Sequence, residues 1–231
     1  MNKNVVAIIP ARGGSKRIKN KNLISVLNKP LIYYSIVQAK MAKNIADVYV
    51  SSDNIKILNY AKSLDCKVIK RPKNLSNDFS SSEEALSHAL KQIEKEINVD
   101  SVMLLQCTSP IRTSQNLDDA IVSFYEKKAD SLISVTKHNR FLWEKKDKDF
   151  VSINYDFRKR PRSQDINEQY LETGSFYITK RDVLCRYNNR LGGKIVPFEM
   201  NFLTNFEIDV PEDITVVEWA FKKYQSEIIE N

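Results

Sequence analysis

The sequence of 231 residues has few of the residues on which several common protein classes depend. Its three cysteines, Cys66, Cys107 and Cys185, are odd in number and widely spaced. This pattern fits neither a disulfide framework nor a zinc site, so we expect reduced thiols in a cytoplasmic protein. With only His88 and His138 as histidines, Cys107 has no evident neighbouring base, which argues against a cysteine nucleophile.

Long apolar runs and repeats are also missing. No stretch of 18 apolar residues occurs, so we expect no membrane span. An apolar strand begins at Val5, which leaves no room for a secretory signal peptide before it. The chain also lacks internal repeats, low-complexity tracts and the aromatic-basic interleaving of many nucleic-acid binders. We therefore expect a single domain over residues 1–231 that binds neither membranes nor nucleic acid.

The charge balance is positive, with 36 Lys and Arg against 29 Asp and Glu. A net charge of +7 is compatible with nucleic-acid binding and equally with an enzyme whose substrates are a nucleoside triphosphate and a carboxylate. The basic residues gather in loops that follow strands rather than along one helix face. This distribution favours small anionic substrates.

The densest group of basic residues follows the first apolar run, residues 5–9. Two of the chain's five glycines, Gly13 and Gly14, lie here, and paired glycines would let the backbone turn with positive φ close to a ligand. The basic residues of this loop are Arg12, Lys16, Arg17, Lys19 and Lys21. Because like charges repel, we expect the loop to bind a polyanion, although a solvated basic turn is the alternative. The pattern matches neither the P-loop nor the dinucleotide fingerprint.

Apolar strand patterns alternate with helical patterns along the first 135 residues. Strands are predicted over 5–9, 47–51, 67–70, 101–105 and 131–135, and helices over 30–42, 54–64, 81–97 and 116–128. This alternation predicts right-handed crossovers and an α/β fold with a mainly parallel sheet. Ligands of such sheets bind at the carboxyl ends of the strands, so the residues that follow each strand are the site candidates.

Several polar residues follow these strands. Arg71 comes after strand 67–70 and has a planar guanidinium that suits recognition of acceptor atoms. Ser81 and Ser82 begin the next helix, although capping by Ser80 and Glu83 alone would explain this cluster. Gln106 follows strand 101–105, and its amide can read a base or a hydroxyl or can simply cap neighbouring backbone.

The rhythm changes between residues 136 and 170. This segment is polar, basic and free of glycine, yet it contains scattered apolar residues such as Trp143 and Phe150. We predict an excursion from the sheet, with a solvated basic hairpin as the alternative. A strand should then return to the core over 170–178.

Near the C-terminus two carboxylates alternate with an apolar residue. On an extended strand, Glu207 and Asp209 point to the same face. Adjacent carboxylates repel one another unless a cation lies between them, and Mg²⁺ prefers such oxygen ligands. We therefore predict a Mg²⁺ site, with Mn²⁺ as an alternative metal. The competing interpretation is that Asp209 caps a helix that begins near Pro211.

Two stretches resemble the signatures of the sugar-acid cytidylyltransferases, which make CMP-activated sialic acid and its relatives. The first is a strand ending in Pro-Ala-Arg, then Gly-Gly-Ser-Lys and Lys-Asn, over residues 10–22; the second is Leu-Leu-Gln-x-Thr-Ser-Pro-x-Arg over residues 104–112. A Thr-Gly pair before an aromatic strand, at Thr173 and Gly174, extends the similarity. The resemblance implies a Rossmann-like nucleotide-diphospho-sugar transferase fold. It also implies transfer of CMP from CTP to the anomeric hydroxyl of an acidic keto-sugar, with release of pyrophosphate.

The resemblance also implies roles for individual residues. The implied catalytic residues, which neutralise phosphate charge, are Arg12, Lys16 and Lys21. The implied nucleotide-binding residues are Ala11, Arg12, Asn22, Arg71, Ser81, Ser82 and Gln106. The implied sugar-binding residues are Gln106, Thr108, Ser109, Thr173 and Gly174. The implied metal ligands are Glu207 and Asp209, where Glu207 departs from the usual Asp. Segment 136–170 is implied to form a homodimer and to lend residues to the partner's sugar site.

Some questions remain open in the sequence. Several sialic-acid members have a basic residue shortly before the glycine, where this chain has Leu171, Glu172 and Thr173. Sialic, legionaminic and pseudaminic acids and 3-deoxy-octulosonate are therefore all candidate acceptors, and a bacterial di-N-acetylated nonulosonate is slightly favoured. Two other functions stay open: a sugar-1-phosphate nucleotidyltransferase that uses another nucleotide, and a non-catalytic basic nucleic-acid-binding domain.

Overall fold

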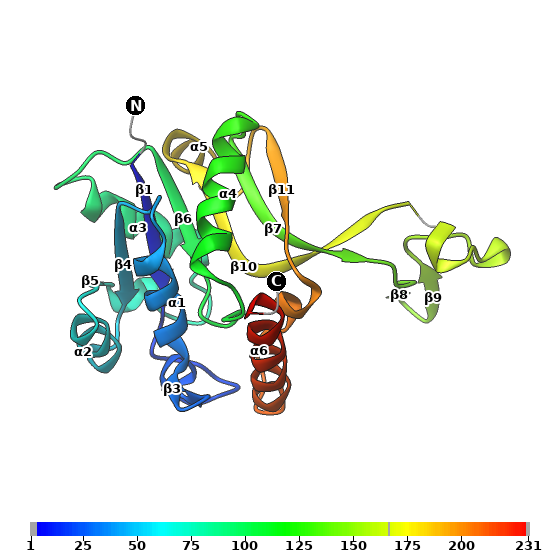
Figure 1. The fold of residues 1–231 in the computed structure, drawn as a ribbon, viewed down its shortest axis with the longest axis horizontal. Coiled ribbons are helices and arrows are strands. Elements are labelled where there is room, and N and C mark those ends of the chain that lie inside the picture. The colour runs from blue at the N-terminus through cyan, green and yellow to red at the C-terminus, as the bar shows by residue number, and fades with distance from the viewer. Residues whose placement is uncertain (1–3, 166, 230–231) are drawn as a thin grey trace.

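The computed structural model describes residues 4–165 and 167–229 and is built around a seven-stranded sheet (Figure 1). The strand order is β11-β7-β10-β6-β1-β4-β5. The strands are β1 (Val5–Pro10), β4 (Asp47–Ser52), β5 (Lys67–Lys70), β6 (Ser101–Leu105), β7 (Ser131–His138), β10 (Gln169–Lys180) and β11 (Ile195–Glu199). The helices are α1 (Leu31–Met41), α2 (Ile55–Ser63), α3 (Ser82–Ile93), α4 (Ser114–Glu126), α5 (Arg181–Tyr187) and α6 (Asp213–Ile229).

The sheet is parallel apart from one strand. β10 is antiparallel to both β6 and β7, whereas every other pairing in this sheet is parallel. The crossover helices return the chain to the start of the next strand, which keeps strand directions equal. β10 runs in the opposite direction because no crossover precedes it. The chain leaves the sheet at the end of β7, turns in the excursion, and returns along β7 as β10. The predicted α/β fold with a mainly parallel sheet is confirmed.

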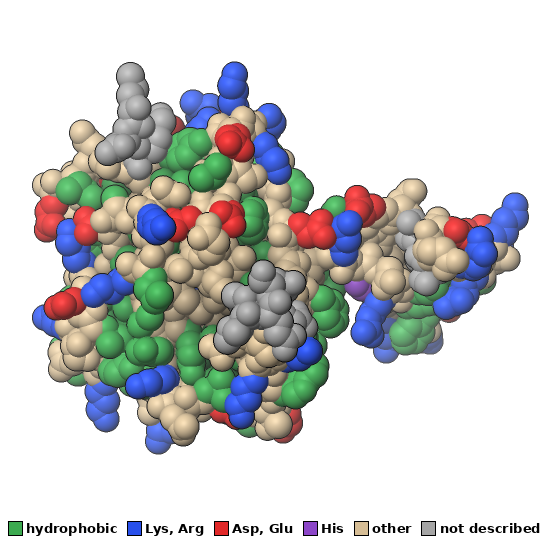
Figure 2. Space-filling model, viewed as in Figure 1, with side chains coloured by type: hydrophobic (Ala, Val, Ile, Leu, Met, Phe, Trp, Pro, Cys, Tyr) green, Lys and Arg blue, Asp and Glu red, His purple; other side chains and the backbone are tan. Residues whose placement is uncertain are grey.

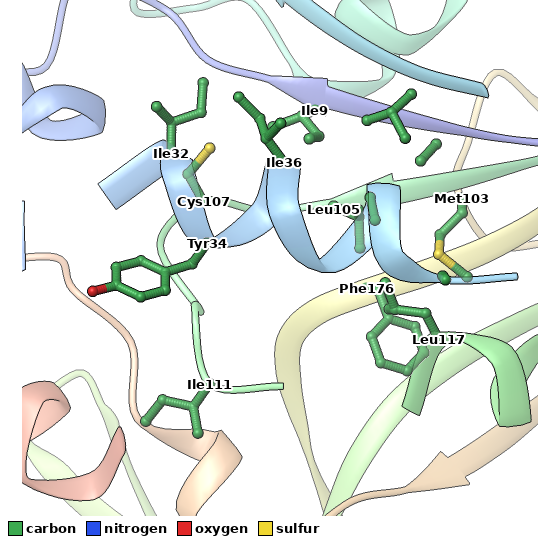
Figure 3. Packing of buried hydrophobic residues seen from close by; sticks show 14 of the residues in the cluster. Ile9, Ile32, Tyr34, Ile36, Met103, Leu105, Cys107, Ile111, Leu117 and Phe176 are labelled. Atoms are coloured by element: carbon green, nitrogen blue, oxygen red, sulfur yellow. The ribbon is translucent and has the colours of Figure 1, made fainter. Parts of the chain in front are cut away.

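Both faces of the sheet are covered, which explains the uninterrupted apolar runs of the central strands. In β1, Val5, Ala7 and Ile9 pack in a core with apolar residues of α1, α2, α4 and α6. Val6 and Ile8 point to the other face and pack with α3 and α5. Figure 3 shows part of the first core, where Ile9 of β1 lies beside Ile36 of α1.

Several predicted boundaries differ from the structure. The helix predicted over 81–97 ends at Ile93, and the one predicted over 116–128 spans Ser114–Glu126. The sequence pattern did not reveal α5, β11 or the small hairpin of β2 (Ser25–Val26) and β3 (Lys29–Pro30). The extended strand assumed at residues 207–209 is wrong, because a 3₁₀ turn at Phe202–Asn205 is followed by irregular chain.

The segment after β7 leaves the body as a projecting arm (Figure 1). Its tip is a separate hairpin of β8 (Trp143–Lys146) and β9 (Asp149–Ser152). Aromatic rings hold the arm together, with Phe141 and Tyr155 at a centroid distance of 4.4 Å. Figure 2 shows basic and hydrophobic side chains exposed along it, and Phe150 is 65% exposed. The predicted excursion over 136–170 is therefore present, with β7 and β10 forming its stem.

Within residues 4–165 and 167–229, no helix combines the length and apolar character needed to cross a membrane.

Candidate active site

A cleft of about 340 Å³ opens where β1 and β6 end. Neighbouring parallel strands bring their carboxyl ends to one edge of the sheet, so the residues that follow them meet there. Most of the predicted site residues line this cleft: Arg12, Lys21, Asn22, Arg71, Ser81, Ser82, Gln106 and Thr108. The cleft brings these residues together, and their roles stay predictions.

The glycines of the basic loop act differently from the prediction. Neither Gly13 nor Gly14 has a φ in the left-handed region. Gly13 is required by packing, because a Cβ there would lie 2.7 Å from the Asn54 side chain, and its amide donates to Asp53 at 2.9 Å. A Cβ on Gly14 would meet nothing within 4 Å. The expected positive φ is therefore wrong, and close backbone packing is the reason for Gly13.

One carboxylate joins two cations of this loop. Asp78 forms ion pairs with Lys16 at 2.8 Å and with Arg12 at 3.3 Å, and Arg12 also donates to the Asn77 carbonyl at 2.8 Å. The hydrogen bond from Lys16 holds the pKa of Asp78 below its usual value. The two cations of this group are thus arranged around a single anion at the rim of the cleft.

A second carboxylate joins two further cations from the same loop. Lys21 donates to Asp209 at 2.7 Å and to the Ile208 carbonyl at 2.9 Å, and Arg17 lies 3.3 Å from Asp209. Only 15% of the Lys21 side chain is exposed. This contact brings the C-terminal acidic segment to the basic loop near the N-terminus of the chain.

Asp209 does not cap α6, so the capping interpretation is wrong. The carboxylate of Asp213, the first residue of α6, accepts from the amides of Asp209 at 2.7 Å and Val210 at 2.8 Å, and so fixes the turn that precedes the helix. The Asp209 carboxylate itself contacts Lys21 and Arg17. Although Glu207 keeps contact with solvent, desolvation of its carboxyl raises its pKa, and the charge of Asp209 raises the pKa further. Two adjacent carboxylates fit a Mg²⁺ site that substrate phosphates would complete.

Arg71 is a buried cation, and two of its three guanidinium nitrogens have no hydrogen-bond partner among the residues that the structure describes. The residue is 5% exposed, and the two nitrogens are Nε and Nη2. Burial lowers the pKa of the guanidinium, which the nearby Asp53 partly offsets. Buried donors without partners are costly, and Arg71 lines the cleft, so an acceptor atom that reaches the guanidinium would lower this cost.

The serine cluster forms a capping box, but with different members from those predicted. Ser81 caps α3 by accepting from the Glu84 amide at 3.1 Å, and the Glu84 side chain accepts from the Ser81 amide at 2.8 Å. The explanation through Ser80 and Glu83 is therefore wrong, because Glu83 pairs with Arg190 at 2.6 Å. Ser81 and Ser82 place the start of α3 at the wall of the cleft.

Arg112 stabilises the loop that follows β6 through hydrogen bonds to its backbone. This guanidinium is 2% exposed and donates to the carbonyl oxygens of Ser109 at 2.6 Å and Ser175 at 3.1 Å, and to the Ser35 hydroxyl at 2.5 Å. Burial lowers the pKa of Arg112 to about 10. A buried cation bonded to neutral oxygens fixes the path of the Gln106–Ser109 loop, a role that the sequence motif did not indicate.

Thr173 and Gly174 have different roles in the structure. Thr173 is 2% exposed, and its hydroxyl bonds the Ser134 hydroxyl at 2.7 Å inside the sheet, so little of it is available to a sugar. Gly174 has φ +65°, and a Cβ there would lie 3.0 Å from the Gln106 amide and 3.3 Å from the Ser109 hydroxyl. Only glycine therefore allows β10 to pass this close to Gln106.

Cys107 borders the cleft but is 3% exposed. Burial raises the pKa of its thiol to about 12, so the reactive thiolate is not formed near neutral pH. This confirms the interpretation of Cys107 as a small apolar residue. Sequence analysis missed the contacts of Asp78, Glu83 and Arg190, since each of these residues pairs with a partner distant in sequence.

Residues 6–231 match the family model described as Cytidylyltransferase. The chain belongs to the cytidylyltransferase family. It is 32% identical over 221 residues to N-acylneuraminate cytidylyltransferase A of Danio rerio, covering 94% of this chain and 50% of that protein. It is also 32% identical over 180 residues to the pseudaminic acid cytidylyltransferase of Campylobacter jejuni subsp. jejuni serotype O:23/36 (strain 81-176), covering 75% of this chain and 77% of that protein.

The solved structures agree on the fold of this cytidylyltransferase. The structure of a CMP:2-keto-3-deoxy-manno-octonic acid synthetase complexed with CTP matches with a TM-score of 0.72 and 18% identity. That match covers 96% of this chain and 99% of the other. The present chain spans about half the length of the Danio rerio relative. The resemblance drawn from the two sequence motifs is thereby confirmed.

Proposed function

We propose that this cytidylyltransferase transfers CMP from CTP to the anomeric hydroxyl of an acidic keto-sugar and releases pyrophosphate. The observation that carries the proposal is the buried Arg71 guanidinium, with two nitrogens that have no hydrogen-bond partner among the described residues, in a cleft that Arg12 and Lys21 also line. The buried Arg71 offers hydrogen-bond donors, and Arg12 and Lys21 supply positive charge at the rim of the cleft. This combination suits a nucleotide, which has an acceptor-rich base and an anionic phosphate chain.

The nucleotide would lie along the cleft. Arg71 and Gln106 would bind the cytosine or ribose, together with Ala11, Asn22, Ser81 and Ser82. Arg12, Lys16 and Lys21 would neutralise the triphosphate and the leaving pyrophosphate. Because phosphoryl-type transfer depends on positioning and charge neutralisation, these groups need no covalent step of their own.

Glu207 and Asp209 would hold Mg²⁺ or Mn²⁺, which would supply positive charge to the phosphates and would favour ionisation of the attacking hydroxyl. Lys21 contacts Asp209 directly and so links this metal site to the basic loop. The acceptor sugar would lie against Gln106, Thr108, Ser109 and the Thr173–Gly174 backbone, beside Glu207. Gly174 provides space there because a Cβ would meet Gln106 and Ser109, and would lie 3.5 Å from Glu207.

We also propose that the protein is a cytoplasmic homodimer that binds no nucleic acid. The arm exposes apolar residues at positions without a partner in the sheet, including Phe150 at 65% and Ile153 at 59% exposed. Burial of such residues favours association between copies of the chain. In a dimer the arm would reach the neighbouring acceptor site.

The test is a pyrophosphate-release screen. CTP, UTP, GTP and ATP are each incubated with Mg²⁺ and sialic, legionaminic or pseudaminic acid or 3-deoxy-octulosonate. We expect release with CTP and at least one of the acids. Release with another nucleotide and a sugar 1-phosphate would support the alternative enzyme class. Salt-sensitive binding of DNA or RNA without any release would contradict both.

A further inference from the structure

Arg190 lies in the loop between α5 and β11, outside every motif of the sequence. Its guanidinium has three neighbours on three sides. Nε donates to Glu83 of α3 at 2.6 Å, the plane lies over the Tyr177 ring at 4.9 Å, and Nη1 faces the Gln106 amide at 3.1 Å. Since 19% of the side chain is exposed, the group is largely fixed in place.

The two neighbours of the Gln106 amide determine its orientation. The Gly174 carbonyl oxygen can only accept, so the amide nitrogen must lie beside it, at 3.0 Å. Arg190 can only donate, so the amide oxygen must lie beside Nη1. The opposite orientation would place two acceptors together and two donors together.

This arrangement leaves half of the amide free. A primary amide has two acceptor lone pairs and two N–H donors, and Arg190 and Gly174 each use one. The remaining lone pair and N–H belong to a residue that lines the cleft. A molecule that reaches this amide from the cleft would therefore find one acceptor and one donor in a fixed order.

We propose that Arg190 is a positioning residue that sets the donor and acceptor order of Gln106 toward the substrate. The inference rests on the proposed function, because it assumes that Gln106 contacts a substrate. Arginine is required, since its planar fork reaches Glu83 and Gln106 in two directions while its face lies on Tyr177. Lysine could pair with Glu83 but could not make both contacts.

The competing interpretation is structural. Arg190 also ties the loop before β11 to α3, and an ion pair with Glu83 could serve that purpose alone. Arg181 is a matched comparison, because it makes an ion pair of the same kind with Glu94 at 2.6 Å. Arg181 lies at the opposite end of β6 from Gln106. Its amide donates to the carbonyl of Asp100, just before β6 begins, whereas Gln106 follows the last residue of β6.

A double-mutant cycle separates the two interpretations. We expect Arg190→Met to lower kcat/KM by about 10- to 100-fold in the native background and by less than about 2-fold in the Gln106→Ala background. The change in melting temperature should be similar in both backgrounds, because the ion pair with Glu83 is lost in each and only the single bond to Gln106 differs. We expect Arg190→Lys to keep the melting temperature and lose the activity, and Arg181→Met to keep the activity.

Equal loss of kcat/KM in both backgrounds, or full activity of Arg190→Lys, would overturn the inference. If Arg190→Met does not fold, the Arg190→Lys variant completes the same cycle. A spectroscopic readout works without turnover. The side-chain NH₂ resonances of Gln106, identified by their loss in Gln106→Ala, should shift in Arg190→Lys and not in Arg181→Met. Absence of turnover in the native protein would contradict the proposed function alone, and unchanged Gln106 resonances would contradict the role of Arg190.

Discussion

At the scale of single residues, the cleft contains charges of both signs in direct contact. Arg12 and Lys16 share Asp78, and Arg17 and Lys21 share Asp209. Except for Lys21, these side chains remain exposed to solvent, so the ion pairs that they form contribute little to stability. Their proximity matters more for binding, because the cations are concentrated at one rim where a triphosphate would add charge of the opposite sign.

Replacement of Arg12 tests the basic loop. We expect Arg12→Ala to lower kcat by on the order of 10²–10³-fold, because it removes a donor to charge that develops in the transition state. The melting temperature should hardly change. Lys62→Ala is the control, since Lys62 is an exposed cation on α2, outside the basic loop. A variant that keeps more than half of the native kcat would remove Arg12 from the mechanism.

Replacement of the acidic pair tests the metal site. We expect Asp209→Asn and Glu207→Gln to lower activity steeply and to need more Mg²⁺, because each loses a charged oxygen ligand. Asp213, and not Asp209, bonds the amides before α6. The melting temperature of Asp209→Asn should therefore stay close to native. Rates measured against Mg²⁺ concentration decide the assignment, and unchanged dependence in both variants would contradict it.

At the scale of elements, buried polar side chains position the loops that follow the strands. Arg112 bonds the backbone of both the β6 loop and β10, and Glu83 of α3 bonds Arg190 before β11. Each contact joins two segments that hydrophobic packing alone would leave free to slide. The site therefore depends on charged groups inside the body as well as on those at the cleft.

We expect Arg112→Met to destabilise the protein by about 3 kcal/mol or more, since buried carbonyl oxygens would lose their donors. Arg186→Met is the matched control, because Arg186 is exposed on α5. Urea unfolding at neutral pH measures both. A loss below about 1 kcal/mol would show that water or other donors replace the guanidinium.

The Glu83–Arg190 pair predicts a pH effect on stability. Burial alone would raise the pKa of Glu83, but the hydrogen bond and charge of Arg190 outweigh it, and the pKa lies below the usual 4.5. A carboxyl with a lower pKa in the folded state stabilises fully above its unfolded pKa and loses that contribution as the pH falls through the folded value.

We therefore expect native protein to exceed Glu83→Gln in unfolding free energy by about 2 kcal/mol at pH 7. The difference should shrink below pH 4.5. Glu126→Gln, at an exposed position on α4, should show no such difference. Urea unfolding across the pH range measures it, and a difference that persists undiminished in acid would contradict the argument.

At the scale of the whole molecule, the arm extends far from the body (Figure 1) and adds nothing to the core of the sheet. Its aromatic residues pack mainly on one another, as Trp143 does on Phe157 at 5.6 Å. Several of its apolar side chains remain exposed. The proposed dimer would cover these side chains.

We expect sedimentation to show a dimer at micromolar concentration. Phe150→Asp and Ile153→Asp should shift it toward monomer and lower the activity, because they place charge in the buried contact. Ile55→Asp is the control, since Ile55 is 63% exposed at the start of α2, away from the arm. A fully active native monomer would contradict the proposed dimer.

Local patterns in the sequence determined much of this protein. The apolar run at residues 5–9 indicated β1, and alternation of strands and helices indicated the mainly parallel sheet. Because parallel strands end at one edge, this topology also placed Arg12, Arg71 and Gln106 together. Short-range periodicity and the residues that follow each strand were sufficient for these features.

Only the tertiary structure decided which side chains pair. Lys21 contacts Asp209, Gln106 faces Arg190, and Glu83 bonds Arg190 rather than capping α3. The irregular path of residues 206–209 and the close packing of Gly13 were likewise decided there. Such contacts join segments far apart in the chain, and their geometry depends on strand order and on loop paths that no local pattern encodes.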